Sequence, residues 1–344
     1  MIMLTVNKKI LDKILSLYGI CGQALSVEEL LRYDCEVGEQ DREELRLILK
    51  VSFGSKSPVV IKFRGGCEGR NARPVIAQQT EFADCRLRNC IPTSRYYKSG
   101  QNFAVPMRIE GYDTVITVED YVENEITAVD EQIAQKTGSL LAMTHNISEQ
   151  FDFHIENPVI FDPFNDWNDL FDFESFYELA PHFASDDKVL FERICDAYHA
   201  KKKLLEPLRQ RKRYAVQGDL SDCNTFLSAN GEIGLFDFNC GGDTVLFGDA
   251  VMQGWFVAHL MNYTCPQTEE YSRRLFESFM DGYRSRRSIS EEEEAMIPAF
   301  YSLITAFDCR TIRHNEKNLC SAAENGDGEL VSGLLQEIWR KISE

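Results

Sequence analysis

The sequence lacks the signals that would place the chain in several common classes. None of its eleven cysteines forms a Cys-x-x-Cys pair, which argues against a zinc site, and their odd number and wide spread argue against a disulfide framework. No apolar run approaches the ~18 residues that span a bilayer. Met1–Val6 is apolar but is followed at once by Asn7, Lys8 and Lys9, the wrong order for an export signal. We therefore expect a cytoplasmic protein with reduced thiols.

Positive charge is also scarce. The chain has 37 lysines and arginines against 55 aspartates and glutamates, which gives a formal net charge of -18. A surface this negative repels nucleic acid and anionic membranes, so we expect neither as a partner. The charge is compatible with a small cationic molecule, and no pattern in the sequence points to an oligomeric state.

The length suits two domains or one two-lobed unit. The chain has 344 residues, 44% of them hydrophobic, and a domain takes roughly 150 residues. Its character changes at a short acidic connector, 119–126 (EDYVENEI). Residues 1–118 predict an N-terminal lobe built on antiparallel strands, and residues 127–344 predict a mainly α-helical C-terminal lobe, so the fold class is α+β. The predicted strands are 30–35, 45–53, 59–63, 103–108 and 113–118, and the predicted helices are 7–18, 74–89, 128–146, 186–205, 246–262, 269–285, 291–306 and 329–342.

A predicted hairpin near residue 230 carries the most informative local pattern. Two short apolar runs, 225–228 and 233–236, flank Asn230-Gly231, a strong hairpin signal because both residues tolerate positive φ. If these two residues form the turn, counting outward places Asn224 directly opposite Asp237. Directly opposed residues lie roughly 4.5–5.5 Å apart. The turn therefore predicts that these two polar side chains emerge side by side at the open end of the hairpin.

A third polar group is tethered to this pair. Asp219 lies five residues before Asn224, in a loop opened by Gly218. An aspartate and an asparagine suit a hard cation such as Mg²⁺, and a further carboxylate can orient a hydroxyl group or accept its proton. The set is typical of phosphoryl transfer. The alternative is an ordinary surface hairpin whose carboxylates cap turns.

These residues match the motif of a known family. Gln217–Asn224 (QGDLSDCN) is followed by Phe236–Phe238 (FDF), and the sequence thereby resembles the aminoglycoside phosphotransferase and choline kinase superfamily, whose pattern is H-G-D-x-x-x-x-N, a strand and then I-D-F. The resemblance implies a bilobal protein-kinase-like fold. It also implies that Asp219 is the catalytic base and that Asn224 and Asp237 bind Mg²⁺.

The resemblance implies further roles in the first lobe. Lys62, within VVIKF, sits where the family's strand lysine contacts the ATP phosphates, and Glu81 in the following helix is placed to pair with it. The connector resembles the family's hinge, where backbone groups of Asp120 and Val122 would bind adenine. The residues alone also allow an edge lysine that reaches water and an ordinary exposed helix glutamate.

The resemblance therefore implies a small-molecule kinase that transfers the γ-phosphate of ATP to a substrate hydroxyl, with ATP and Mg²⁺ as cofactors. Two departures motivate an alternative, a catalytically weak nucleotide-binding regulatory protein on the same fold. Gln217 replaces the family histidine, and the loop 36–41, where the family has glycines, carries one glycine and three acids. A protein kinase is disfavoured, because no Arg-Asp precedes the catalytic-loop position and no Ala-Pro-Glu follows it.

One segment offers a hint about the substrate. Residues 161–178 (FDPFNDWNDLFDFESFYE) combine aromatic and acidic side chains. Aromatic faces and carboxylates favour a cationic amine or ammonium ligand. The alternative is an amphipathic helix with buried aromatic rings and solvated acids.

Overall fold

The computed structural model describes residues 4–33, 45–65, 69–162, 164–168, 170–220, 224–259 and 268–344, so the loop 36–41 lies outside the described residues. The chain forms two compact units, here named the sheet unit and the helical unit. The sheet unit comprises Met1–Thr127, Asn146–Asn157 and Asp222–Asp243, and the helical unit comprises Ala128–His145, Pro158–Ser221 and Thr244–Glu344.

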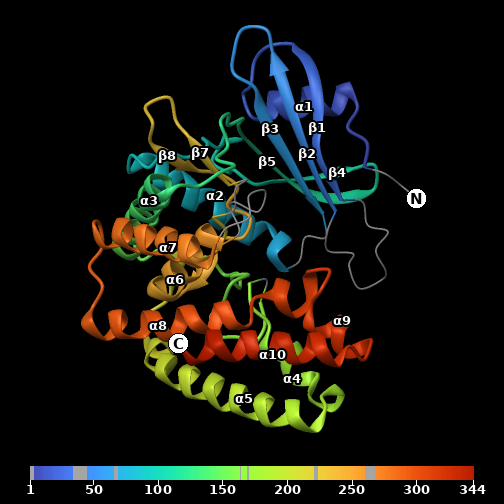
Figure 1. Ribbon diagram of the computed structural model, residues 1–344. Coiled ribbons are helices and arrows are strands. Elements are labelled where there is room, and N and C mark those ends of the chain that lie inside the picture. The colour runs from blue at the N-terminus through green and yellow to red at the C-terminus, as the bar shows by residue number, and fades with distance from the viewer. Residues whose placement is uncertain are drawn as a thin grey trace. The chain divides into compact units, whose positions relative to one another are not determined.

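A five-stranded sheet with the order β1-β2-β3-β5-β4 forms the centre of the sheet unit (Figure 1). Every neighbouring pair in it is antiparallel. Helices α1 and α2 and the β7–β8 hairpin belong to the same unit. The bounds are Lys8–Leu17 for α1, Ala24–Tyr33 for β1, Arg46–Phe53 for β2, Val59–Gly65 for β3, Arg73–Arg88 for α2, Val105–Ile109 for β4, Tyr112–Asp120 for β5, Thr225–Leu227 for β7 and Ile233–Leu235 for β8.

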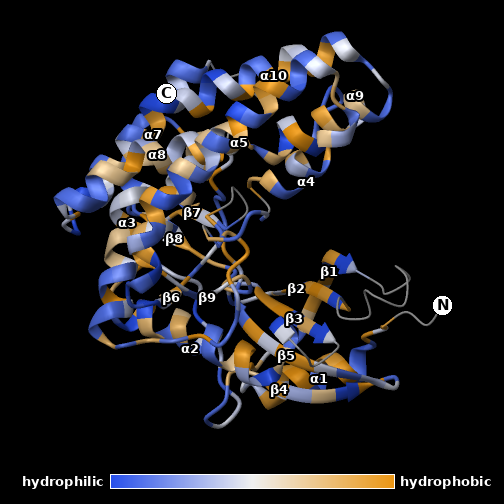
Figure 2. Cartoon of the chain, turned by 90° about the horizontal axis from the view of Figure 1, so that it is seen from below, coloured by the Kyte–Doolittle hydropathy of each residue, from blue (hydrophilic) through white to orange (hydrophobic). Residues whose placement is uncertain are grey.

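The two faces of this sheet differ, because side chains alternate between faces along each strand. One face is apolar: alternate residues of β2, β3 and β5 pack against Ile14 and its neighbours on α1. Figure 2 accordingly colours these strands as largely hydrophobic. The other face carries buried polar residues, among them Lys62, Arg64 and Glu119. The apolar face holds the unit together, and the polar face presents charged groups at fixed strand positions.

The helical unit is centred on α6. Nearly every residue of this helix is buried, including Asp249 and Gln253, which is the pattern of a core helix surrounded by protein. The amphipathic helices α7 and α10 bury one stripe each. The bounds of the remaining elements are Glu131–Gln150 for α3, Phe173–Glu178 for α4, Ser185–Leu205 for α5, Tyr214–Val216 for β6, Gly242–Thr244 for β9, Leu246–His259 for α6, Glu269–Arg284 for α7, Glu291–Ala306 for α8, Leu319–Glu324 for α9 and Gly328–Ser343 for α10.

The predicted α+β class, with an N-terminal antiparallel sheet and a mainly helical remainder, is confirmed. The largest difference is β1, which begins at Ala24, six residues before the predicted start. This edge strand is mostly exposed, so it lacks the alternation of apolar residues by which strands are found in a sequence. The lobe boundaries predicted from the sequence stay predictions. Within the described residues no helix combines the length and apolarity needed to cross a membrane.

Candidate active site

The β7–β8 hairpin has a different register from the predicted one. The structure pairs Thr225 with Leu235 and Leu227 with Ile233. The amide of Ser228 donates a hydrogen bond of 2.8 Å to the Glu232 carbonyl oxygen, so the turn contains three residues, 229–231, where two were predicted. A two-residue Asn-Gly turn needs positive φ at both positions, but in this loop only Gly231 has one, at 74°.

This shift corrects the predicted pairing of Asn224. It lies opposite Phe236, whose amide donates a hydrogen bond of 3.0 Å to the Asn224 carbonyl oxygen, and the prediction that Asp237 stands directly opposite is wrong. Asp237 is the next residue along the chain. Both polar residues still emerge at the open end of the same hairpin, offset by one position.

Asp237 sits in a strained backbone conformation among cationic groups. Its φ is 51°, which is uncommon for a residue other than glycine and typical of sites where function imposes strain. Its carboxylate lies 3.1 Å from the Lys62 ammonium and 2.9 Å from the Arg46 guanidinium. Burial by itself raises the pKa of Asp237, but the charges of Lys62, Arg46 and Arg64 outweigh it and hold the pKa well below its usual range. The carboxylate is therefore ionised and available as a hard oxygen ligand.

Lys62 is paired with Glu119 and Asp237, which corrects the predicted pairing with Glu81. The Lys62 ammonium forms an ion pair with the Glu119 carboxylate, and both side chains are about 95% buried. Thr117 faces Lys62 across the β3–β5 ladder, so Glu119 is its diagonal neighbour on the same face. Glu81 lies at an exposed position of α2.

The predicted hinge residues follow directly at the end of β5. The amide of Asp120 donates to the Arg95 carbonyl oxygen at 2.9 Å. The Asp120 carboxylate accepts a hydrogen bond of 2.6 Å from the Tyr97 hydroxyl. An adenine contact from this residue would therefore have to use its carbonyl oxygen. Val122 lies two residues further, half-buried and outside any strand.

Asp219 lies in the helical unit, in the loop after β6. Its amide donates a hydrogen bond of 2.8 Å to the Gln217 side-chain oxygen, and Gln217 is fully buried. Gly218 between them has a φ of 83°, a conformation that favours glycine. The residue that replaces the family histidine thus fixes the backbone of the proposed base.

A buried chain of hydrogen bonds anchors the same loop to α6. The amide of Leu220 donates to the Gln253 side-chain oxygen at 2.9 Å, and Gln253 contacts Asp249 at 3.3 Å. Asp249 in turn lies 3.0 Å from His145, whose other ring nitrogen is 2.9 Å from the Tyr283 hydroxyl. Because every side chain in this chain is buried and bonded, it holds the loop rigidly. Asp249 and His145 therefore have a structural role.

The groups that could hold a metal ion are few. No cluster of three or more histidine, cysteine, aspartate or glutamate side chains occurs in the part of the chain that the structure describes. Asn224 and Asp237 offer one amide and one ionised carboxylate. This set fits Mg²⁺, which takes one or two carboxylates from a protein and completes its shell with phosphate oxygens and water.

The aromatic and acidic segment near residue 170 is largely structural. Phe173 stacks on Tyr198 with ring centroids 3.5 Å apart, and Phe176 is fully buried. Asp166 accepts a hydrogen bond from the Tyr198 hydroxyl, and fully buried Asp172 pairs with Arg313 at 2.6 Å. These rings and carboxylates satisfy one another within the helical unit, so they give no direct support for a cation-binding pocket.

Comparison of the sequence with known proteins gives little information about function. No family model matches the chain. An uncharacterized protein from Deinococcus radiodurans is 33% identical over 86 residues, which is 25% of this chain and 24% of that protein. The match thus spans about a quarter of that relative's length.

Comparisons of structure cover nearly the whole chain. An amicoumacin kinase in complex with AMP-PNP and Ca²⁺ has a TM-score of 0.60 at 18% identity, over 98% of this chain and 94% of that one. A microcompartment-associated aminopropanol kinase has a TM-score of 0.59 at 18% identity, over 98% of both chains. An aminoglycoside phosphotransferase from Alicyclobacillus acidocaldarius has a TM-score of 0.51 at 12% identity, over 91% and 94%. These likenesses show the protein-kinase-like fold that the sequence motif implied.

Proposed function

We propose that this chain, which has the protein-kinase-like fold of small-molecule kinases, transfers the γ-phosphate of ATP to a hydroxyl group of a small molecule. In this proposal Asp219 accepts the hydroxyl proton, and Asn224 and Asp237 hold Mg²⁺. When bound, Mg²⁺ neutralises charge on the phosphates during transfer. Lys62 contacts the phosphates, and the backbone of the 120–122 segment binds adenine.

The observation that carries this proposal is the environment of Asp237. Its left-handed backbone, its ion pair with the strand lysine Lys62 and its place at the end of the hairpin that bears Asn224 are the features a phosphate-bound metal site needs. A hairpin with turn-capping carboxylates would not require a buried lysine and an arginine on one aspartate. The surface-hairpin alternative therefore explains less of the structure.

Asp219 joins this set through the chain itself. It is five residues from Asn224, and five residues reach at most about 18 Å. The Gln217 side chain accepts a hydrogen bond from the Asp219 amide, and the Gln253 side chain accepts one from the Leu220 amide. These two bonds fix the loop that carries Asp219. Because hydrogen bonds already fix its loop, Asp219 would lose little conformational entropy when a substrate binds. Phosphoryl transfer depends on such positioning of the reacting groups.

For the acceptor we propose an alcohol that also carries an amino group. The net charge of -18 is compatible with a cationic molecule. Two of the similar structures are kinases named for amino compounds, an aminopropanol kinase and an aminoglycoside phosphotransferase. The free thiols of the described cysteines agree with a reducing compartment, and we propose the cytoplasm.

The alternative remains a weak or inactive nucleotide-binding regulator. It is favoured by Gln217 in place of histidine. The two proposals separate in a screen of amino alcohols, amino sugars and uncharged sugars, in which Mg²⁺-dependent ADP release is measured. Nucleotide binding without turnover on any acceptor would favour the regulator, and phosphorylation of uncharged sugars alone would contradict the amino-containing acceptor.

The decisive variant is Asp219→Asn. Loss of a general base should lower kcat by about 10²–10⁴-fold while Mg²⁺-dependent thermal stabilisation by ATP is retained. Asp196→Asn, at an exposed position in the middle of α5, is the matched control and should keep its full rate. Normal turnover in Asp219→Asn would refute the assigned role.

A further inference from the structure

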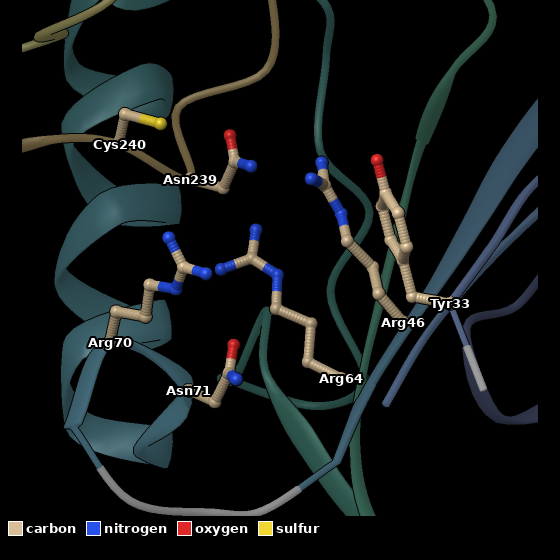
Figure 3. A pocket seen from close by; sticks show the side chains of 7 residues that line it. All are labelled: Tyr33, Arg46, Arg64, Arg70, Asn71, Asn239 and Cys240. Atoms are coloured by element: carbon tan, nitrogen blue, oxygen red, sulfur yellow. The ribbon is translucent and has the colours of Figure 1, made fainter. Parts of the chain in front are cut away.

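The sheet unit contains a cavity that none of these roles uses. Its volume is about 210 Å³, and three guanidinium groups face into it from different elements (Figure 3). The other lining residues that the structure describes are two amides, a phenol and a thiol, and none of the described lining residues is a carboxylate. The lining residues are Tyr33, Arg46, Arg64, Arg70, Asn71, Asn239 and Cys240.

Strand register places two of these arginines against each other. Arg46 on β2 pairs directly with Arg64 on β3, and Tyr33 on β1 pairs with Arg46, so the three form one row across the sheet. Like charges directly opposite each other destabilise a sheet. Among the described residues, the Asp237 carboxylate lies 2.9 Å from Arg46 and is shared with Lys62. The carboxylate of Glu119 also interacts electrostatically with Arg64. Within the described residues, the cationic side chains of Arg46, Arg64 and Lys62 therefore face two carboxylates, so positive charge is in excess there.

Arg64 is the most constrained member of the set. It is 4% exposed, and its Nη1 donates a hydrogen bond of 3.0 Å to Gln79, a neutral acceptor. Its Nε has no acceptor in the portion of the chain that the structure describes. Burial lowers the pKa of Arg64, and the charge of Asp237 only partly offsets this. A buried guanidinium normally finds an anionic partner, because leaving its donors unmatched is unfavourable.

The start of α2 adds to the positive potential. Arg70 and Asn71 lie directly before this helix, whose N-cap residue Ala72 makes no side-chain capping bond. The first turn contains no acidic residue. The positive end of a 16-residue helix favours anions, and here it lies beside the same cavity.

We infer that this cavity is a binding site for a tetrahedral oxoanion, such as phosphate or sulfate, held by the guanidinium groups of Arg46, Arg64 and Arg70. Such groups bind oxoanions through paired, charge-assisted hydrogen bonds. The anion could be a phosphate of the bound nucleotide or a separate phosphate. Only this choice of carrier rests on the proposed kinase function.

The test is the binding of inorganic phosphate to the full chain at constant ionic strength. Binding is measured by calorimetry and by the shift in thermal unfolding. Arg70 is exposed, so Arg70→Gln should fold, and it should weaken phosphate binding about tenfold, as expected for one charged hydrogen bond. Arg73→Gln removes the same charge from an exposed position on α2 that does not line the cavity, and it should bind like the unaltered chain. The inference is overturned if phosphate does not bind saturably, or if both variants bind equally.

A second arm separates the two carriers. Phosphate binding is measured again in the presence of Mg²⁺ and saturating AMP-PNP, or of adenosine. If AMP-PNP abolishes phosphate binding and adenosine does not, the site binds a phosphate of the nucleotide. Phosphate binding retained beside AMP-PNP would identify a separate anion. If the protein binds phosphate but no nucleotide, the proposed kinase function is refuted and the proposed anion site is retained.

Discussion

Glu119 carries one half of the buried ion pair that neutralises Lys62 on the polar face of the sheet. Glu119→Ala would leave Lys62 buried with Asp237 as its remaining partner, and Asp237 is already shared with Arg46. Breaking a buried pair from one side leaves an uncompensated charge, so the free energy of unfolding should fall by about 3 kcal/mol or more. Urea unfolding at neutral pH measures this.

Glu81→Ala provides the control for that substitution. Glu81 is exposed on α2, and an exposed substitution of this kind should change the free energy of unfolding by no more than about 0.5 kcal/mol. If Glu81→Ala destabilised the chain as much as Glu119→Ala, the helix glutamate would be the true partner of Lys62, as the family resemblance implied.

Residues of the candidate site differ in how far the sequence reveals them. Asp219, Asn224 and Asp237 can be found because they belong to one short motif with fixed spacing. Glu119 and Arg46 cannot, since their roles depend on which strands become neighbours and in which register. That information is non-local, and a single strand sequence shows only which residues share a face.

Helices α3 and α7 approach so closely that each needs a glycine at the contact. A Cβ at Gly282 would overlap the Gln135 carbonyl oxygen, and a Cβ at Gly138 would overlap that of Phe279. Gly282→Ala should therefore lower the free energy of unfolding by about 3 kcal/mol or more, because backbone atoms of two packed helices would have to move apart. Chemical denaturation reports the change.

Gly333→Ala in α10 is the matched substitution without a neighbour, since nothing lies within 4 Å of a Cβ there. It should stabilise the chain by up to about 1 kcal/mol, because alanine favours the helix. Equal effects of the two substitutions would mean that α3 and α7 do not touch at Gly282.

Elements with strong periodicity were predictable, and those set by a single backbone angle were not. Helices α1 and α7 bury residues spaced three and four apart on one face. The β7–β8 turn was not predictable in detail, because an Asn-Gly pair suits both a two-residue turn and a three-residue loop with glycine in the left-handed position. The structure adopts the second, which moves Asn224 by one register step.

The division of the whole molecule does not follow the order of the chain. Residues 222–243 return to the sheet unit, where backbone hydrogen bonds join Leu235 to Pro92 and Thr225 to Ile126. Sequence patterns assign elements in linear order, so they could not place this hairpin with a sheet formed a hundred residues earlier. Asn224 and Asp237 thus belong to the sheet unit, and Asp219 belongs to the helical unit.

Acid stability should depend on two histidines with opposite effects, one in each unit. His154 in the sheet unit has its pKa raised by its hydrogen bond to Asp243, so it stabilises the fold below about pH 6.5 and loses this effect as the pH rises through its folded pKa. His259 in the helical unit has its pKa lowered to about 4, mainly by burial. Between about pH 6.5 and 4 the unfolded chain takes up a proton that folded His259 does not, so stability falls on acidification.

His259→Gln should therefore reduce the loss of stability between pH 7 and pH 5, by on the order of 1 kcal/mol. The variant should be less stable at pH 7, because it loses the stacking of the ring on Trp255, 4.4 Å away. His154→Gln should act in the opposite sense and steepen the loss, and His182→Gln, at an exposed position, is the control. Urea unfolding at pH 7, 6 and 5 measures the three slopes. Parallel slopes for His259→Gln and the unaltered chain would show that the ring is not held in its neutral form by burial.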